Sequence, residues 1–375
     1  MDFFTSVDLI LFLGISQGIF LAITLQLVSN RNRSANKVLS LTLLIAALML
    51  AGRIISVQSP NLMLFRIASF ADTVIFLFGP LVYIYVRRLT FQEFPEFRLS
   101  FYHFIPAFLH VIFFLLTLLY SLEEFGTLLM NGSFFEIYAI IEGSGVVSVF
   151  YYCFLSYILI KTYQQKEKDN LSYVQSVMSY LYVFLLVIFL FSVVWLISYM
   201  NSYYLRIPSL YFISYNLIWM CIPVYIYVVG FYSLRQPEIF RITDKKKKDT
   251  VQKERLEGEI LDRLKKDLEY LMVTENIYLN NNLTLRDLSE KLSTSSNNIS
   301  WLLNNIHQCS FYDYINHYRV KAFIQKIQNG EHHNHTLLAL SLDSGFNSKS
   351  TFNKAFKSEM NDTPTNYIKK LTTAV

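Results

Sequence analysis

The chain has 375 residues, of which 53% are hydrophobic and 16% are charged, and its formal net charge is +5. Soluble domains carry about 25% charged residues, so this composition excludes a chain that is soluble along its whole length. Charge is also uneven, because 21 of the 33 Lys and Arg and 17 of the 28 Asp and Glu follow Phe231. The sequence therefore predicts an apolar first part and a polar last part, each in its own solvent.

Seven apolar runs occupy the first part, and each approaches the roughly 20 residues that a helix needs to cross a bilayer. The few polar residues between them could not cover seven helices of a soluble protein. We therefore expect a seven-transmembrane-helix bundle in residues 1–232, whose first helix is a membrane span and not a cleaved signal peptide. The runs are Leu9–Val28, Val38–Val57, Ile67–Val86, Phe101–Tyr120, Tyr138–Ile160, Leu181–Met200 and Leu210–Val229.

The loops between the runs alternate in charge. Basic residues follow the first, third, fifth and seventh runs, whereas the other connections carry almost none apart from Arg206. Since positively charged loops stay in the cytoplasm, we expect the N-terminus outside and the C-terminal part inside. Lys245–Lys248 would flank the last helix beside anionic headgroups. The other basic loop residues are Arg31, Arg33, Lys37, Arg87, Arg88, Arg98, Lys161, Lys166, Lys168, Arg235 and Arg241.

Ionisable residues interrupt several apolar runs. By residue count, Arg53, Asp72 and Glu142 lie in the outer half of the membrane, with Gln17 and His110 deeper. Charged groups at such depths need a partner or water. Two interpretations stay open: a structural ion pair that holds helices together, and an outward-facing pocket for an unknown small-molecule signal.

No pattern in the sequence indicates catalysis or a cofactor. Leu210–Val229 lacks the lysine that would bind retinal, His110 stands alone, and Cys153, Cys221 and Cys309 are far apart. Paired carboxylates, an activated nucleophile and a phosphate-binding loop do not occur. We therefore expect no enzyme activity, no metal and no cofactor.

Residues 233–275 are expected to form a basic juxtamembrane linker and an amphipathic helix. Within Thr250–Met272, apolar residues recur at helical spacing between charges. This apolar face would either pack on the domain that follows or pair with a second copy of the chain. Residues 276–375 would then complete an all-α protein. The spaced apolar residues are Leu256, Ile260, Leu264, Leu268 and Leu271.

The segment LTLRDLSEKLSTSSNNISWLLNNI predicts two short helices. Thr284 suits the N-cap of the first, with Asp287 three residues later, and Ser295 or Ser296 would cap the second. Two helices joined by a short turn form the helix-turn-helix plan, in which the second helix enters the major groove of DNA. The outer face of that second helix carries Asn297, Ser300, Trp301 and Asn304.

The same plan recurs in TLLALSLDSGFNSKSTFNKAFKSEM. A helix that begins at Thr336 ends at Gly345, which suits a left-handed helix end, and Asn347 or Ser348 would cap the next helix. Asn pairs with adenine in the major groove, and Lys contacts guanine or phosphate. The outer side of this helix carries Lys349, Ser350, Asn353, Lys354 and Lys357.

The stretch GFNSKSTFNKAFKSEMNDTP, with the preceding LLALSLDSGF, resembles the second helix-turn-helix of the AraC/XylS family of bacterial regulators. The first pair, through SFYDYINHYRV, is similar to the same family, and the likeness covers about Tyr278–Lys370. It implies that the helices at Ser296–Ile306 and Ser348–Glu359 read adjacent major-groove segments. The base-reading positions that the resemblance implies are Asn297, Ser300, Trp301, Lys349, Ser350, Asn353 and Lys354.

Two turns depart from the family pattern. Asn361 stands where a glycine usually precedes the TP pair, and Gln308 takes the equivalent place in the first unit. Asn tolerates the left-handed conformation, whereas Gln308 predicts a less regular turn. The connecting helix, Phe311–Gln328, would span about 27 Å, which suits major-groove openings about 34 Å apart.

Together these features predict a membrane-bound one-component transcription regulator in the inner membrane of a bacterium, with promoter double-stranded DNA and the lipid bilayer as partners. RNA polymerase, a second copy of the chain (a homodimer) and a signalling membrane protein are further candidate partners. Two alternatives stay open. One is a transporter or channel whose tail regulates its own gene, and the other is a passive anchor controlled by a partner membrane protein.

Overall fold

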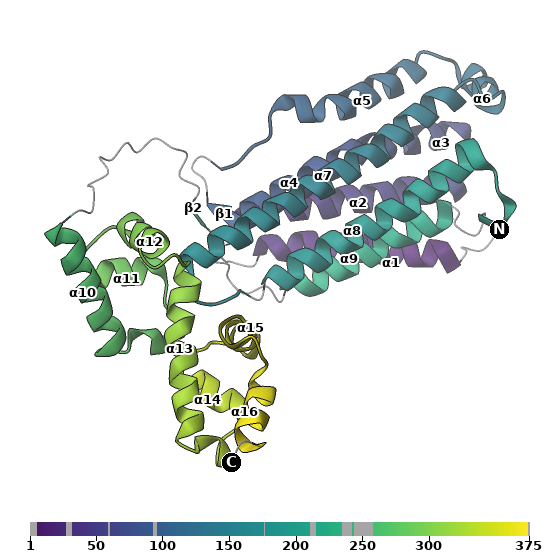
Figure 1. Ribbon diagram of the computed structural model, residues 1–375. Helices are drawn as coiled ribbons and strands as arrows, with labels where there is room; N and C mark the ends of the chain where they lie inside the picture. Colours follow the sequence, from purple (N-terminus) through teal and green to yellow (C-terminus); the bar gives the residue numbers. More distant parts are fainter. Residues whose placement is uncertain are drawn as a thin grey trace. The chain divides into compact units, whose positions relative to one another are not determined.

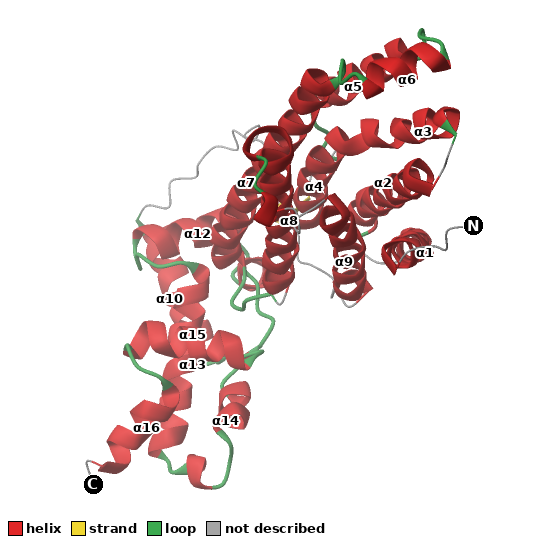
Figure 2. Cartoon of the chain, turned by 90° about the vertical axis from the view of Figure 1, so that its right-hand side faces the viewer, coloured by secondary structure: helices red, strands yellow, loops and turns green. Residues whose placement is uncertain are grey.

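The computed structural model describes residues 6–27, 32–58, 61–92, 96–175, 177–210, 215–234, 242–243 and 258–373. Helices dominate these ranges (Figure 2), so the all-α prediction is confirmed. The strands within the same ranges, β1 (Phe91–Gln92) and β2 (Ile242–Thr243), have two residues each and pair in parallel. The basic run Lys245–Lys248 lies outside the described residues.

Contacts divide the chain into two compact units. The bundle unit contains residues 1–161 and 176–244, and the C-terminal unit contains residues 162–175 and 245–375. Residues 162–175 thus group with the polar end of the chain, although two further apolar runs follow them in sequence. No local pattern in the sequence indicates this grouping.

Each of the seven apolar runs overlaps a helix (Figure 1). One of these helices, α7, is 36 residues long and continues without a break from the bundle unit into the C-terminal unit. The helices are α1 (Ser6–Leu27), α2 (Arg33–Gln58), α3 (Leu62–Ala68), the 3₁₀ helix η1 (Ser69–Val74), α4 (Ile75–Thr90), η2 (Phe101–Phe104), α5 (Ile105–Thr117), α6 (Leu122–Met130), α7 (Phe135–Asn170), α8 (Val177–Met200), the π-helical η3 (Asn201–Leu205), η4 (Pro208–Leu210) and α9 (Tyr215–Leu234).

Five helical stretches among the described residues are long and apolar enough to cross a membrane: Ser6–Leu27, Arg33–Gln58, Leu62–Thr90, Phe135–Asn170 and Met178–Leu205. The fourth predicted run, Phe101–Tyr120, contains η2 and α5 and ends at a sharp bend, because the following helix, α6, leaves this stretch at 116°. Ser121 and Glu124 form a capping box there, which starts a new helix. The shorter apolar helix Leu217–Ser233 overlaps the seventh run from residue 217 onward.

Close helix packing in the bundle unit depends on small residues. α2 packs against α1, α9 and the α3–η1–α4 stretch. A Cβ added at Gly52 would lie 2.4 Å from the Cβ of Ala71, and one added at Gly14 would lie 2.7 Å from the Cγ of Pro223. Since lipid tails are as apolar as the helices, such close contacts are a main source of helix association in a bilayer.

Helices are the main elements of the C-terminal unit in its described residues, apart from residues 171–175 and the turns. After the end of α7, its elements begin with the amphipathic helix and finish near the end of the chain. They are α10 (Glu259–Val273), η5 (Ile277–Leu279), α11 (Leu285–Lys291), α12 (Ser296–Asn305), α13 (Phe311–Gln328), η6 (Glu331–His333), α14 (Leu337–Asp343), α15 (Lys349–Met360) and α16 (Pro364–Thr373).

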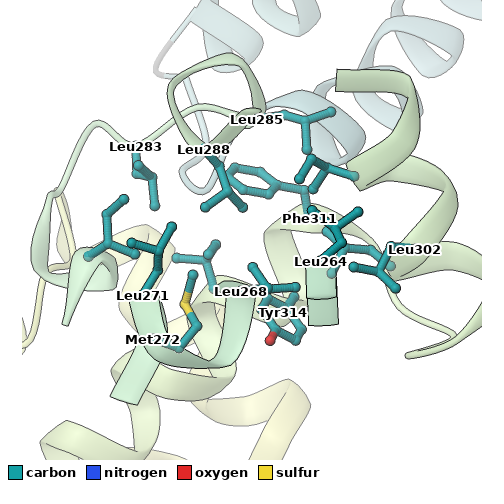
Figure 3. Close-up of a cluster of buried hydrophobic side chains, with 14 residues drawn as sticks. Leu264, Leu268, Leu271, Met272, Leu283, Leu285, Leu288, Leu302, Phe311 and Tyr314 are labelled. Carbon is teal, nitrogen blue, oxygen red and sulfur yellow. The ribbon is translucent and has the colours of Figure 1, made fainter. Parts of the chain in front are cut away.

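Two hydrophobic clusters form the core of this unit, and α13 contributes to both. The first cluster, drawn in Figure 3, joins α10, α11 and α12 to the first half of α13 through Phe311 and Ile315. The second joins α14 and α15 to the rest of α13 through Val320 and Phe323. This helix has the predicted bounds and carries both helix pairs.

The apolar face of α10 packs within its own domain. Leu264, Leu268 and Leu271 are buried in the first cluster, so this face is not available for pairing with a second copy. Packing, one of the two alternatives that the sequence left open, is therefore what the structure shows. Ile260 is exposed at the margin, and Leu256 lies outside the described residues.

Candidate DNA interface and bundle cavity

Local hydrogen bonds fix the ends of the first helix pair, α11 and α12. Thr284 begins α11 with a capping box, in which its Oγ1 accepts from the Asp287 N–H at 3.2 Å and the Asp287 carboxylate accepts from the Thr284 N–H at 2.9 Å. Ser295 caps α12 by accepting from a backbone N–H of its first turn. The Ser289 and Ser296 hydroxyls, 2.9 Å apart, connect the two helices.

The outer face of α12 presents the residues predicted to read DNA. Asn297, Trp301 and Asn304 are exposed, and Ser300 is half-buried. The side-chain amide of Asn304 donates to Ser300 Oγ at 3.3 Å. Trp301 keeps 40% of its surface exposed, although large apolar side chains are usually buried. Because α12 has no Lys or Arg, this face offers hydrogen bonds and an aromatic surface but no charge.

The second pair, α14 and α15, repeats the arrangement. Thr336 caps α14 by accepting from the Ala339 N–H at 3.1 Å. Ser348, and not Asn347, caps α15 by accepting from the Thr351 N–H at 3.2 Å. Both helix starts therefore have the side-chain caps that the sequence predicts.

The outer face of α15 is strongly basic. Its buried side contains Phe352 and Phe356, and the residues predicted to face DNA all lie on the exposed side. The Lys354 ammonium lies 5.9 Å from the centre of the Tyr312 ring, so it is held near the start of α13. The exposed set is Lys349, Ser350, Asn353, Lys354 and Lys357.

Left-handed residues end the helices of both pairs. Gly345 has a φ of +92°, and a Cβ there would lie 2.4 Å from the carbonyl oxygen of Tyr278, so both conformation and space require glycine. Asn361 has a φ of +52°, as predicted, and Gln308 has a φ of +53°. Gln308 therefore adopts the same left-handed conformation as Asn361, but Asn361 is itself the C-cap of α15, whereas Gln308 lies two residues beyond Ile306, the C-cap of α12.

The bundle unit contains a cavity of about 410 Å³. Three of the five polar residues that interrupt the apolar runs, Asp72, His110 and Glu142, line it. Gln17 and Arg53 are not among the lining residues. Its walls are mainly aromatic, from Phe78, Phe113, Phe114, Tyr138, Phe191, Trp195, Trp219 and Tyr225 among others.

The polar groups of the cavity differ in how they are bonded. The Trp195 indole N–H donates to Glu142 at 2.9 Å. Asp72 acts electrostatically on Arg53, whose guanidinium also lies 5.9 Å from the centre of the Trp219 ring. Among the described residues, the buried His110 Nδ1 and the Tyr225 hydroxyl have no hydrogen-bond partner.

Sequence reasoning did not identify two features near these sites. Arg319 lies in the predicted connecting helix but is completely buried, although arginine is seldom fully buried without partners. Asp8 lies in the first helix, where its carboxylate accepts from the Gln58 side chain at 2.7 Å and also acts on Arg53. For Asp8, the lone charge in an apolar run was the only available signal, whereas Arg319, with Lys321 two residues later in a polar helix, gave none.

Comparison with known proteins supports the C-terminal assignment. Residues 288–370 match a family model described as a helix-turn-helix domain, which is of the AraC type. Neither the curated proteins nor the solved structures contain a significant match to the chain. Groups of three or more His, Cys, Asp or Glu suited to a metal do not occur among the described residues.

Proposed function

We propose that the chain is a membrane-bound transcription regulator whose bundle, residues 1–232, holds a cytoplasmic DNA-binding domain, residues 276–375. The observation that carries this proposal is the mounting of two capped helix pairs on α13, where residues 288–370 match a helix-turn-helix domain. In each pair the second helix has an exposed polar face. Such a helix is the element that enters the major groove.

We expect α12 and α15 to contribute differently to DNA binding. α15 brings three exposed lysines, which neutralise phosphates and make the affinity dependent on salt. Asn353 lies between these lysines in the sequence, and its side chain can form hydrogen bonds with adenine. α12 contributes Asn297 and the exposed Trp301, whose ring can contact a thymine methyl group. Most of the affinity would therefore come from α15, with α12 adding selectivity.

Substitutions on α15 test this proposal. The purified full chain in nanodiscs would first select its site from a random-sequence duplex library. Asn353→Ala is then expected to weaken binding to that site by about 1–3 kcal/mol and to relax the preference at one base position. Lys357→Ala is expected to weaken binding to all sequences and to flatten the salt dependence, because it loses a phosphate contact.

Lys266→Ala, an exposed lysine on α10 outside the matched residues, serves as the matched control. It should leave both the affinity and its salt dependence unchanged. An unaltered base preference in Asn353→Ala would contradict the assignment of α15 to the groove. Failure of the wild-type chain to select any sequence would remove the proposed function itself.

The seven-helix arrangement of the bundle has a direct test by reporter fusion. Because positively charged loops stay in the cytoplasm, we expect Arg33, Arg88 and Lys166 to lie there. A reporter that is active only outside the inner membrane should therefore be silent when fused after these three residues, and active when fused after Pro60 or Gly126. Activity after Arg88 would contradict the proposed topology, and normal protein levels of each fusion provide the control.

The cavity is the proposed point of signal entry. Its volume is in the range of drug-sized ligand sites, which are also mostly apolar with a few polar groups that orient the ligand. Asp72, His110 and Tyr225 bring polar atoms to these aromatic walls. We therefore propose a small amphipathic signal, with an apolar body and a head group that donates hydrogen bonds to Asp72.

A further inference from the structure

The segment between α7 and α8 makes specific contacts with the helix-turn-helix region. Residues 171–175, called here the docking segment, follow directly from the last turns of α7 and belong to the C-terminal unit. They have the sequence LSYVQ. Leu171 and Ser172 are completely buried, which is unusual for a connection between helices.

One end of the docking segment binds at the cap of α11. Leu171 forms an antiparallel bridge with Thr284, the N-cap residue. The Ser172 backbone N–H donates to the Leu283 carbonyl oxygen at 3.3 Å, and the Ser172 hydroxyl donates to the same oxygen at 2.7 Å. The segment thus binds the first helix pair through its backbone, as an added strand would.

The middle of the docking segment binds the buried face of α13. Arg319 donates to the Ser172 carbonyl oxygen at 2.8 Å and to the Ser172 hydroxyl at 3.0 Å. The Asn316 side chain also donates to that carbonyl oxygen, at 3.0 Å. Arg319 further donates to the carbonyl oxygens of Tyr278 and Asn280, each at 2.7 Å. Ser172 therefore completes the solvation of a fully buried guanidinium.

The other end of the docking segment reaches α15. The Val174 N–H donates to Thr351 Oγ1 at 3.3 Å, and Thr351 is completely buried in the first turn of that helix. The Gln175 N–H donates to the Glu167 carboxylate at 3.0 Å, which closes the segment back onto α7. Five residues thus connect the first helix of one pair with the second helix of the other.

Charge near this contact opposes DNA binding. Glu167 is 5% exposed, and Lys354 on the outer face of α15 acts electrostatically on its carboxylate. Asp169 lies close enough to Asp313, at the start of α13, for their charges to interact. An approaching phosphate would compete with Glu167 for Lys354 and would be repelled by these acids.

We propose that Asn316 and Arg319, with the backbone around Leu283 and the first turn of α15, form a docking site whose occupant is residues 171–175 of the same chain. Its occupancy holds the DNA-binding domain in a weakly binding state, and release of the segment raises the affinity. Since α7 is continuous from Phe135 to Asn170, a shift of this helix in the bundle acts directly on the segment. The inference rests on the proposed DNA-binding function.

A crosslink tests the docking site in the full chain. Val174→Cys and Thr351→Cys would be introduced together after Cys153, Cys221 and Cys309 are replaced by alanine. A short bismaleimide should join the two thiols, because the parent residues are in hydrogen-bond contact. In nanodiscs, the joined chain is expected to bind the selected duplex about tenfold more weakly, by fluorescence anisotropy, than the same chain before the reaction. Each single-cysteine chain, treated identically, is the control for the reagent.

The opposite result is expected when the docked state is weakened. Glu167→Gln combined with Asp169→Asn should tighten binding several-fold, and Lys168→Gln, on the same turn of α7, should not. Equal affinity of the joined and unjoined chains, or no crosslinked product, would overturn the docking site. Weaker DNA binding by the Glu167→Gln, Asp169→Asn chain would contradict the proposal that docking lowers the affinity. If the parent chain selects no duplex at all, the fault lies with the proposed function.

Discussion

Replacing Arg319 by Met is expected to lower the stability of the C-terminal unit by about 3–5 kcal/mol, because several buried carbonyl oxygens would lose their donor. Burial lowers the pKa of Arg319 to about 10, so the side chain is still charged at neutral pH. Its partners include the carbonyl oxygens of Ser172, Tyr278 and Asn280. Met fills a similar volume but donates no hydrogen bond.

Hydrogen exchange of peptides from α13 in the full chain measures this effect. A loss of 3 kcal/mol corresponds to exchange faster by a factor of about 100. Arg286→Met is the matched control, because Arg286 pairs with Glu290 on the surface and its side chain is 79% exposed. That substitution should change stability by less than about 1 kcal/mol. Wild-type protection in Arg319→Met would show that the buried guanidinium is dispensable.

Replacing Arg53 by Ala is expected to destabilise the bundle unit by several kcal/mol, because Asp72 would lose the cation that acts on it. The double variant Arg53→Ala, Asp72→Asn should recover much of this loss, since residue 72 then carries no charge that needs the lost cation. Arg98→Ala, at an exposed loop position, should have no such effect. A double variant no more stable than Arg53→Ala would show that these two charges are not coupled.

The buried thiol of Cys153 provides the measurement. With Cys221 and Cys309 replaced by alanine, reaction of Cys153 with a thiol dye reports unfolding of the bundle during heating. The single variant Asp72→Asn separates stability from sensing, because it keeps Arg53 but weakens the proposed hydrogen bond to the signal. Arg53 keeps Asp8 and the Trp219 ring as neighbours in this variant. We therefore expect it to fold and to lose the response of a promoter reporter. A normal response would exclude Asp72 as the group that binds the signal.

Both the cavity and the docking segment involve α7. Glu142 lines the cavity near the start of this helix, and the docking segment follows its last residue. A ligand that changes the packing around Glu142 can therefore bias an element with two states, docked and released. Such a ligand must bind the two states with different affinity, because equal affinity would shift nothing.

The positions of the apolar helices and the first residues of the two helix pairs were predictable from the sequence. Capping at Thr284 and Thr336 involves groups three residues apart, so the pattern that predicts it is local. Glycine at position 345 was predictable for a similar local reason, because a left-handed helix end favours glycine. The apolar runs depend only on composition over about 20 residues. These features led to the prediction of a membrane bundle and to the residues of the candidate DNA interface.

The cavity was predictable only in part. Residue counting placed Arg53, Asp72 and Glu142 at a similar depth, but depth does not determine the direction in which a side chain points. Glu142 bonds to Trp195, 53 residues away, and Arg53 is influenced by Asp8 as well as Asp72. Rotation of a helix about its axis is set by packing against its neighbours, and a single sequence does not specify it.

Only the tertiary structure shows which residues the docking segment contacts. Ser172 and Arg319 are 147 residues apart, and neither position has a pattern that differs from an ordinary loop or an ordinary helix. Periodicity and capping report interactions over a few residues, whereas a buried cation is satisfied by whichever oxygens the fold brings to it. The sequence therefore determined the helix pairs, their caps and the chemistry of α12 and α15. The fold decided that residues 171–175, between two apolar helices, contact the C-terminal unit at Arg319.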